Sequence, residues 1–245
     1  MAFFIGNSFC KLCQMSQEQL ISELLLCARG LFAKGMPPAD NAIQSARLPG
    51  SNEIWIVPPV KSFIELEQIK CDKIDANNFV VTSNDHISEI SLHVLMYNLR
   101  PDVNAIFHTM NPYTISAIVD GLLLVHGEAA LILGDIPIIE NEFVQKIRKG
   151  YKEYVNLVAK ASIGEPLRPV RTIILKQNGV ISMGACIHET RAFAEIIEEW
   201  ARFKTIAKIY GPILNVLTLE QLRALGSRYA RSIKFGGRQA PINHS

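Results

Sequence analysis

The hydrophobic pattern of the chain predicts an amphipathic helix near its start. Between Ser16 and Lys34, apolar residues recur every three or four positions, which places them on one face of a helix. Ser16 and Gln19 have the spacing of a capping box, in which each side chain satisfies a backbone N–H group of the other residue. Gly35 and the prolines that follow it end the helix. The predicted apolar face consists of Leu20, Leu24, Cys27 and Leu31.

A second segment, residues 88–113, predicts a helix, a sharp turn and a strand that bring a carboxylate and an imidazole together. The helix carries Glu89, and Pro101 stops it because proline disfavours a helical residue before it. Residues 103–107 are apolar and predict a short strand. His108 follows at the C-terminal end of that strand, where α/β proteins often place functional residues. The buried face of the helix is predicted to consist of Leu92, Leu95, Met96 and Leu99.

Further apolar runs and helical patterns complete the prediction of an α/β fold. The polar stretch 70–75 is predicted to be a loop or a short helix, and Asn178-Gly179 predicts the turn of a hairpin. No linker or repeat interrupts the pattern, so we expect a single domain over residues 1–245. Strands are predicted at 41–50, 53–57, 79–82, 136–139, 172–176 and 180–183, and helices at 112–119, 142–161, 188–210 and 218–230.

The composition limits the classes of partner. Of 245 residues, 49% are hydrophobic and 20% are charged, which is typical of a globular protein and argues against disorder. The net charge of +2 gives no electrostatic reason to expect nucleic acid or an anionic membrane as a partner. No apolar run reaches the roughly 18 residues that span a bilayer. We therefore expect a cytoplasmic protein without a nucleic-acid or membrane partner.

Residues 88–110 resemble the class II (zinc-dependent) sugar-phosphate aldolase and adducin-domain family. That family carries a Ser-Glu pair, a Leu-His pair, an Arg-Pro-Asp-Val turn and a His-x-His motif at a strand end. The matching residues here are Ser88-Glu89, Leu92-His93, Arg100-Pro101-Asp102-Val103 and His108-Thr109-Met110. The resemblance covers about residues 16–210 and leaves a C-terminal helix and tail at 211–245. It implies a central, mainly antiparallel sheet flanked by helices, and a homotetramer.

The resemblance also implies a zinc site, but two of its three histidines are replaced. The family uses both histidines of His-x-His and a third from a His-Gly hairpin. Here only His108 remains, because Met110 and Asn178 occupy the other two positions. Zinc normally needs at least three nitrogen, oxygen or thiolate ligands, and a thioether or an amide is a poor substitute. We expect a degenerate site in which His108 is at most a weak ligand and zinc is lost.

A substitute metal site stays open as an alternative. His86, Glu89 and His93 are spaced so that they share one face of the predicted helix, and His108 would complete a set of ligands. We favour a structural role for His93 and a solvated position for His86.

Glu89 is the strongest catalytic candidate, because the matching residue in the family takes and returns the proton. Loss of zinc removes a nearby positive charge, so we expect the pKa of Glu89 to rise. Asn178 and the Gly179 N–H group are the candidate donors to a developing oxyanion, and Tyr113 is a further catalytic candidate. The candidate substrate-binding residues are Asn41, Ser88, His108 and Gly179.

The family's phosphate-binding turns are also altered. The positions that bind substrate phosphate match Asp40-Asn41 and Val57-Pro58-Pro59-Val60 here. Proline has no N–H group, valine has no hydroxyl, and an aspartate adds negative charge. We expect weak anion binding at this edge unless Lys61 or Ser62 compensates.

Three functional interpretations follow. The first is an aldolase-like lyase or isomerase that acts on a small hydroxy-carbonyl compound with an altered or absent metal. The second is a catalytically silent binding or assembly protein that resembles the adducin head domains. The third is a conventional zinc aldolase or epimerase with rearranged ligands. The sequence favours the first two about equally.

Overall fold

The computed structural model describes residues 15–38, 42–60, 62–77, 85–118, 132–133, 136–140, 151–163, 170–211 and 221. For residues 85–88, 151–155 and 162 it describes the backbone alone. The described residues form a seven-stranded sheet in the order β3-β2-β1-β4-β7-β6-β5. The strands are β1 (Gln44–Arg47), β2 (Glu53–Val57), β3 (Asp72–Asp75), β4 (Ala105–Thr109), β5 (Ile138–Ile139), β6 (Thr172–Leu175) and β7 (Gly179–Gly184).

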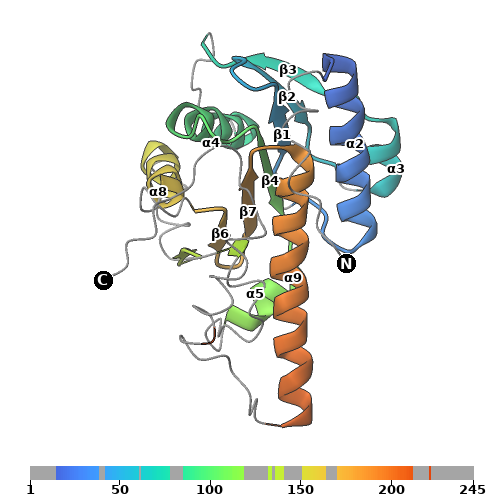
Figure 1. The fold of residues 1–245 in the computed structure, drawn as a ribbon, viewed down its shortest axis with the longest axis vertical. Helices are drawn as coiled ribbons and strands as arrows, with labels where there is room; N and C mark the ends of the chain where they lie inside the picture. Colours follow the sequence, from blue (N-terminus) through green and yellow to red (C-terminus); the bar gives the residue numbers. More distant parts are fainter. Residues whose placement is uncertain are drawn as a thin grey trace.

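The sheet is antiparallel except at one edge, where β5 pairs in parallel with β6. Helices lie on both of its faces (Figure 1). The expected α/β fold with a mainly antiparallel sheet flanked by helices is therefore confirmed. The strand β4 lies at the centre of the sheet between β1 and β7, so any side chain on it is enclosed by protein.

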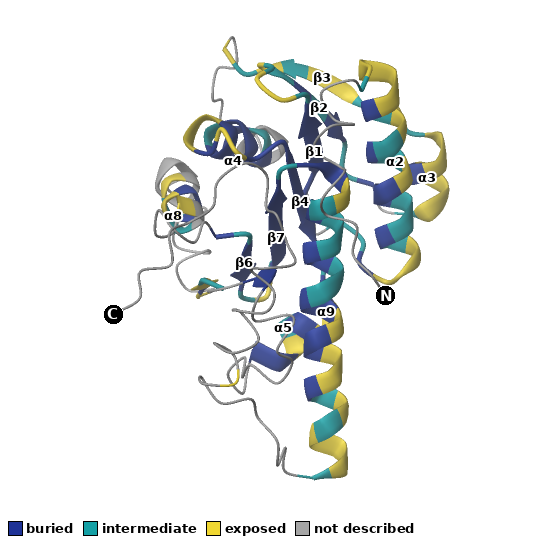
Figure 2. Ribbon diagram, viewed as in Figure 1, coloured by how far each residue is buried: buried dark blue, intermediate teal, exposed yellow. Residues whose placement is uncertain are grey.

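Two helical layers cover the sheet. The helices α4 and α8 pack on one face, and α2 and α9 pack on the other, where α9 extends past the end of the sheet (Figure 1). The central strands are buried, whereas the far end of α9 is largely exposed (Figure 2). The helices are α2 (Gln17–Ala33), α3 (Phe63–Gln68), α4 (Asp85–Leu99), α5 (Pro112–Ala117), α8 (Tyr151–Ile163) and α9 (Ile187–Tyr210). No helix among the described residues is both long and apolar enough to cross a membrane.

The first helix follows its sequence pattern closely. Ser16 Oγ accepts from the Gln19 N–H group at 3.2 Å, and the Ser16 N–H group donates to Gln19 Oε1 at 2.9 Å, which completes the predicted capping box. The four residues of the predicted apolar face are all buried against the sheet. The helix begins and packs as its sequence predicts.

The buried face of α4 differs from the prediction. Leu92 and Met96 are buried as expected, but Leu99 is 42% exposed. Polar residues, His93 and Tyr97, are instead fully buried against the sheet. The prediction of Leu99 as a core residue is therefore wrong. The buried face of the helix includes His93 and Tyr97, which are hydrogen-bonded inside the protein, and Leu99 lies outside that face.

One edge of the sheet was also missed. Residues 70–75 were expected to form a loop or a short helix, but Asp72–Asp75 form the edge strand β3, which pairs with β2. The side chains of β3 are mostly exposed and charged, as is common on edge strands, so no alternating pattern marked it. The helix α3 was not expected either. The predicted strand 79–82, the helix 218–230 and the start of the helix 142–161 lie outside the described residues.

The long helix α9 holds both ends of the short helix α5. Glu198 accepts hydrogen bonds at 2.8–3.0 Å from the Tyr113 and Thr114 N–H groups and from the Thr114 hydroxyl. At the other end, Lys204 Nζ lies 3.5 Å from the Ala117 carbonyl oxygen. Negative charge at a helix N-terminus and positive charge at its C-terminus are both favourable. The two side chains therefore fix α5, which directly follows β4.

The contribution of this clamp is measurable. Glu198→Ala removes the acceptor of two backbone donors, so we expect the free energy of unfolding to fall by about 1–3 kcal/mol. Glu199→Ala is the matched control, because among the described residues the only ion pair of this exposed neighbour is with Arg202, at 3.6 Å; it should cost less than about 0.5 kcal/mol. Urea denaturation measures both, and equal losses would contradict the clamp.

Candidate functional site

A buried carboxylate and an imidazole meet beneath α4. Glu89 lies on the second turn of α4, and His108 lies on β4 facing it. Glu89 Oε1 and His108 Nδ1 are 2.5 Å apart. His108 is 1% exposed and Glu89 is 8% exposed. The structure therefore joins the two residues that the sequence placed at one strand end.

The other ring nitrogen of His108 is also engaged. His108 Nε2 lies 2.7 Å from the backbone carbonyl oxygen of Asn178, in the turn between β6 and β7. A carbonyl oxygen can only accept, so Nε2 carries a proton and donates it. The partner of Nδ1 is a carboxylate oxygen, which also accepts. The two acceptors together favour a doubly protonated, positively charged ring that pairs with ionised Glu89.

Gly179 allows the turn to reach His108. Its φ is +100°, and a Cβ atom there would lie 2.6 Å from the Thr109 carbonyl oxygen and 3.2 Å from His108 Nε2. Any side chain would therefore push the turn away from β4. The structure gives Gly179 a shaping role at the site, and the predicted contact of Gly179 with a substrate stays a prediction.

A chain of buried polar side chains continues from Glu89 along α4 and onto β1. His93 Nε2 lies 3.7 Å from Glu89 Oε1, and His93 Nδ1 lies 2.7 Å from Ser45 Oγ. Ser45 Oγ is in turn 2.8 Å from the Tyr97 hydroxyl. Glu89, His93 and Tyr97 are spaced by four, which places them on one face of the helix. The sequence analysis missed Ser45 and Tyr97; this spacing of polar residues was the available signal for Tyr97.

The electrostatics of Glu89 reverse the expectation from the sequence. Burial alone would raise its pKa, but the positive charge and the hydrogen bond of His108, with a further contribution from the nearby His93, outweigh burial and hold the pKa well below its usual range. The expected rise of the Glu89 pKa is therefore wrong, because His108 itself supplies the positive charge. Burial lowers the pKa of His93 despite the opposing effect of Glu89, so that ring is neutral.

The residues at the family's metal position do not fit zinc. Both nitrogens of His108 are engaged with protein acceptors, so neither offers a lone pair in this arrangement. Met110 offers only a thioether, and the backbone carbonyl group of Asn178 faces the imidazole of His108. Within the described ranges, no cluster of three or more His, Cys, Asp and Glu side chains is placed to hold a metal. The loss of zinc stays a prediction, and the His86 side chain of the substitute site lies outside the described residues.

The remaining candidates are separate from this centre. Tyr113 lies in the first turn of α5 and is 40% exposed. Among the described residues, no hydrogen bond links it to Glu89. Asn41 and the side chain of Ser88 lie outside the described residues, as does Lys61. The catalytic role of Tyr113 and the substrate contacts of Asn41 and Ser88 stay predictions.

At the edge where the family binds phosphate, the hydroxyl of Ser62, which could have compensated for the altered turns, is already hydrogen-bonded. Ser62 Oγ accepts from the Glu65 N–H group at 3.2 Å and so caps α3. Pro58 and Pro59 lie there as expected, and Val60 is buried.

The fold and the centre define an α/β protein with a buried carboxylate–imidazolium pair on its central strand. Residues 22–205 match the sequence profile of the family described as the Class II Aldolase and Adducin N-terminal domain. The chain belongs to this family, as the sequence motifs indicated.

Named relatives agree with this assignment. The chain is 26% identical over 159 residues to an L-fuculose phosphate aldolase of Methanococcus maripaludis, covering 63% of this chain and 80% of the relative. It is 25% identical over 190 residues to a methylthioribulose-1-phosphate dehydratase of Pseudomonas syringae, covering 75% and 93%. An aldolase II superfamily protein from Pseudomonas syringae has the same fold, with a TM-score of 0.68 at 18% identity over 94% of this chain and 90% of that one.

The close approach of Gly179 to β4 predicts a large effect of adding one methyl group. Gly179→Ala combines an unfavourable φ with a steric clash, so we expect the free energy of unfolding to fall by about 3 kcal/mol. Gly50→Ala is the matched control, because Gly50 also has a positive φ but nothing lies within 4 Å of its Cβ position; it should cost about 1 kcal/mol. Chemical denaturation compares them, and similar losses would show that the clash is relieved.

Proposed function

We propose that the protein is a lyase of the class II aldolase type that acts on a small hydroxy-carbonyl compound through Glu89, with a degenerate metal site. The observation that carries the proposal is the buried pair of Glu89 and His108, with His108 anchored on the Asn178 carbonyl oxygen. The names of the relatives, an aldolase and a dehydratase, support chemistry next to a carbonyl group.

The pair can accept a proton from a substrate while the positive charge of His108 balances the negative charge that forms on that substrate. In the free protein, the negative charge of Glu89 balances the positive charge of His108. When Glu89 takes a proton from the carbon next to a carbonyl, the substrate becomes an enediolate, and the charge on His108 remains to stabilise it. The total charge of the site and the substrate is unchanged. The low pKa of Glu89 weakens it as a base, so this stabilisation of the enediolate is essential.

The oxyanion donors proposed from the sequence are only partly available. The Asn178 N–H group donates to the Leu175 carbonyl oxygen within the turn at 2.8 Å, so it is already used. The Asn178 carboxamide and the Gly179 N–H group stay the proposed donors.

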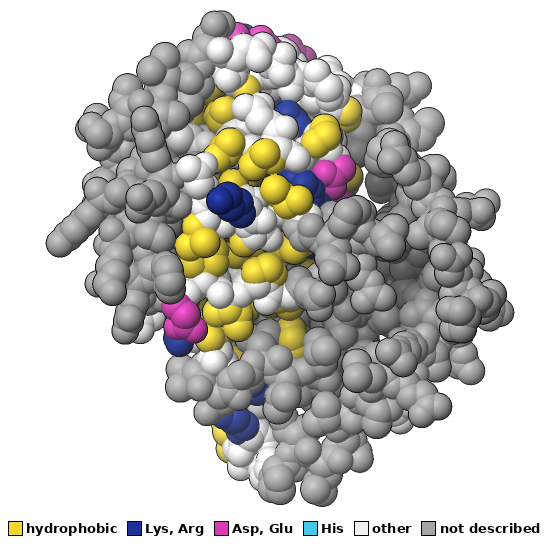
Figure 3. Space-filling model, turned by 90° about the vertical axis from the view of Figure 1, so that its left-hand side faces the viewer, with side chains coloured by type: hydrophobic (Ala, Val, Ile, Leu, Met, Phe, Trp, Pro, Cys, Tyr) yellow, Lys and Arg dark blue, Asp and Glu magenta, His cyan; other side chains and the backbone are white. Residues whose placement is uncertain are grey.

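The alternative function is a catalytically silent binding or assembly protein like the adducin head domains. The burial of the centre supports it, because His108 and His93 are almost completely enclosed by protein. On the face of the molecule drawn in Figure 3, many of the described side chains are hydrophobic.

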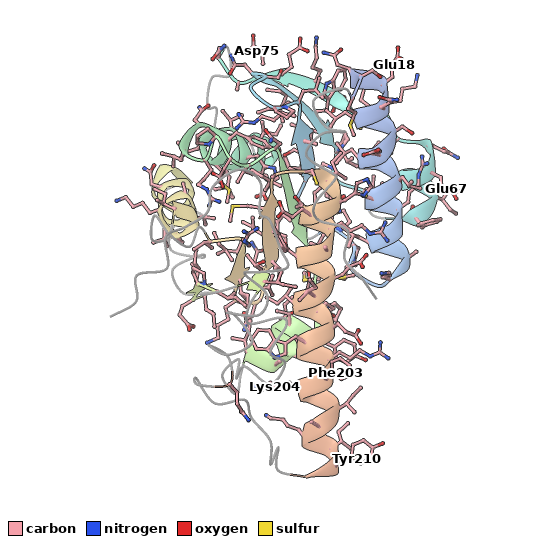
Figure 4. The ribbon with its side chains drawn as sticks, in the orientation of Figure 1. Glu18, Glu67, Asp75, Phe203, Lys204 and Tyr210 are labelled. Carbon is pink, nitrogen blue, oxygen red and sulfur yellow. The ribbon has the colours of Figure 1, made fainter. Side chains whose placement is uncertain are left out.

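The resemblance further implies a homotetramer, and the composition of the sequence predicts a cytoplasmic location; both stay proposals. Apolar side chains at the far end of α9 support self-association: Phe203 and Tyr210, which are 51% and 87% exposed, project from the part of α9 beyond the sheet (Figure 4).

Proton exchange separates the two functions. We expect the protein to catalyse exchange of the proton next to the carbonyl in D2O for at least one member of a panel of small ketoses and hydroxy-aldehydes, with and without phosphate, followed by NMR. Glu89→Gln should slow this exchange at least about 100-fold. Glu140→Gln, which alters an exposed partner of Lys176, should leave it unchanged. No exchange with any compound would favour the silent alternative, and unchanged exchange in Glu89→Gln would refute its role.

Metal content tests the degenerate site independently of activity. After dialysis against zinc and then against buffer, the protein should retain less than one zinc per chain by elemental analysis. The double variant Met110→His and Asn178→His restores the family's ligand types, so it should retain more zinc than the parent. A parent protein that retains one zinc per chain would support the conventional zinc enzyme instead.

A further inference from the structure

Three buried polar side chains next to the reactive pair have no role in the proposed proton transfer. Ser45, His93 and Tyr97 are all at most 1% exposed, yet they form a connected chain that ends at Glu89. His93 Nε2 is buried and has no hydrogen-bond partner among the described residues, and Glu89 Oε1 lies 3.7 Å from it, just beyond hydrogen-bond distance. Buried polar atoms without a hydrogen-bond partner are uncommon in folded proteins, so the position of His93 Nε2 needs a physical explanation.

The positions of the hydrogen atoms along this chain of polar side chains follow from the carboxylate at its Glu89 end. If His93 Nε2 lacked a proton, its lone pair would face a carboxylate oxygen, which is electrostatically unfavourable. A neutral ring has one proton, so that proton is on Nε2, and Nδ1 accepts from Ser45. Ser45 then has no proton left for Tyr97, so its oxygen accepts from the Tyr97 hydroxyl. Every donor in the chain therefore points toward Glu89.

The two histidines thus send their protons to the same carboxylate oxygen. His108 Nδ1 donates to Glu89 Oε1 at 2.5 Å, and a proton on His93 Nε2 would lie near the same oxygen, which is 3.7 Å from that nitrogen. Among the described residues, no donor is found on Oε2. The side chain of Glu89 keeps 11% of its surface exposed, whereas His93 keeps none. The two oxygens of one carboxylate are therefore in different environments.

We propose that Ser45 and Tyr97 are positioning residues that act through His93, holding its Nε2–H bond toward Oε1 and leaving Oε2 of Glu89 as the oxygen that exchanges a proton with the substrate. This inference rests on the proposed function for the reaction itself, but the orientation of the chain stands on geometry alone. Without the Ser45 hydroxyl, Glu89 alone favours the proton on Nε2 and nothing holds the Nδ1 side of the ring, so the preference for this form weakens and the ring is less firmly positioned.

A nucleophilic serine is a different interpretation of the same three residue types, and the structure argues against it. A catalytic serine must reach its substrate, but Ser45 is on a strand inside the sheet and is completely buried. Its proton is directed to a histidine nitrogen that faces away from Glu89. The serine therefore fixes the orientation of His93 and does not itself attack a substrate.

The state of the His93 ring can be measured without any substrate. Long-range proton–nitrogen NMR spectra of the ¹⁵N-labelled protein distinguish the two neutral forms of histidine. We expect His93 to carry its proton on Nε2 in the parent protein and to show a weaker preference for this form in Ser45→Ala. A parent protein with the proton on Nδ1 would overturn the inference, and so would a Ser45→Ala variant whose His93 is unchanged.

Kinetics then test whether the orientation matters. In the D2O exchange assay, on whichever panel compound is most active, Ser45→Ala and Tyr97→Phe should lower kcat about 10- to 100-fold with little change in KM. Ser45→Thr keeps the hydroxyl and should recover most of the rate. Ser182→Ala is the matched control, because Ser182 is equally buried on β7 but its hydroxyl has no hydrogen-bond partner in the part of the chain that the structure describes; the rate and the His93 spectrum should not change.

The outcomes separate the inference from the proposed function. If the parent protein exchanges protons and Ser45→Ala keeps the full rate, the inference fails and the proposed function survives. If the parent has the expected His93 form but exchanges no compound, the proposed function fails, and the assignment of Oε2 fails with it. Thermal melting followed by circular dichroism confirms that each variant is folded; a rate loss in Ser45→Ala that Ser45→Thr does not recover would point to a packing effect and overturn the positioning role.

Discussion

The arrangement of the centre depends on the ion pair between the buried carboxylate of Glu89 and the imidazolium of His108. Removing a carboxylate from water costs several kcal/mol, and a single partner rarely compensates this cost. Glu89 has an imidazolium at 2.5 Å, and that imidazolium has a second acceptor in the Asn178 carbonyl oxygen. The opposite charges make the pair neutral overall. Each ring N–H group of His108 also has an acceptor, so the His108 side is fully hydrogen-bonded. This makes an acid tolerable under a helix in the middle of the domain.

The surrounding elements exist in the geometry that this pair requires. The central strand β4 alternates between the two cores, with Ile106 facing α4 and Phe107 facing α2 and α9. That alternation turns His108 toward α4. Beyond the strand, Asn111 donates to the Ala194 carbonyl oxygen of α9 at 3.1 Å, which ties the end of β4 to the helix that also holds α5. The hairpin closes the third side, and it reaches His108 only because residue 179 is a glycine.

Much of the fold was accessible from the sequence, because its signals were local. The capping box at Ser16, the Asn178-Gly179 hairpin and the length of α9 each depend on neighbouring residues in the chain. The misses depend on contacts that are distant in sequence. The strand β3 has no apolar face and exists because β2 offers it an edge. His93 is buried because Ser45, which precedes it by 48 residues, lies opposite its ring.

The pKa of Glu89 shows how a substitution can be read in the wrong direction when only one partner is considered. Removing zinc takes away positive charge, and that reasoning alone predicts a weaker acid. In the arrangement described, however, both nitrogens of His108 face protein acceptors, and an imidazole between a carboxylate and a carbonyl oxygen is stabilised in its protonated form. A buried positive charge is therefore kept next to Glu89 with a different carrier. The ion pair of Glu89 and His108, completed by the Asn178 carbonyl oxygen, is electrostatically balanced by protein groups alone, so the buried Glu89 does not destabilise the fold.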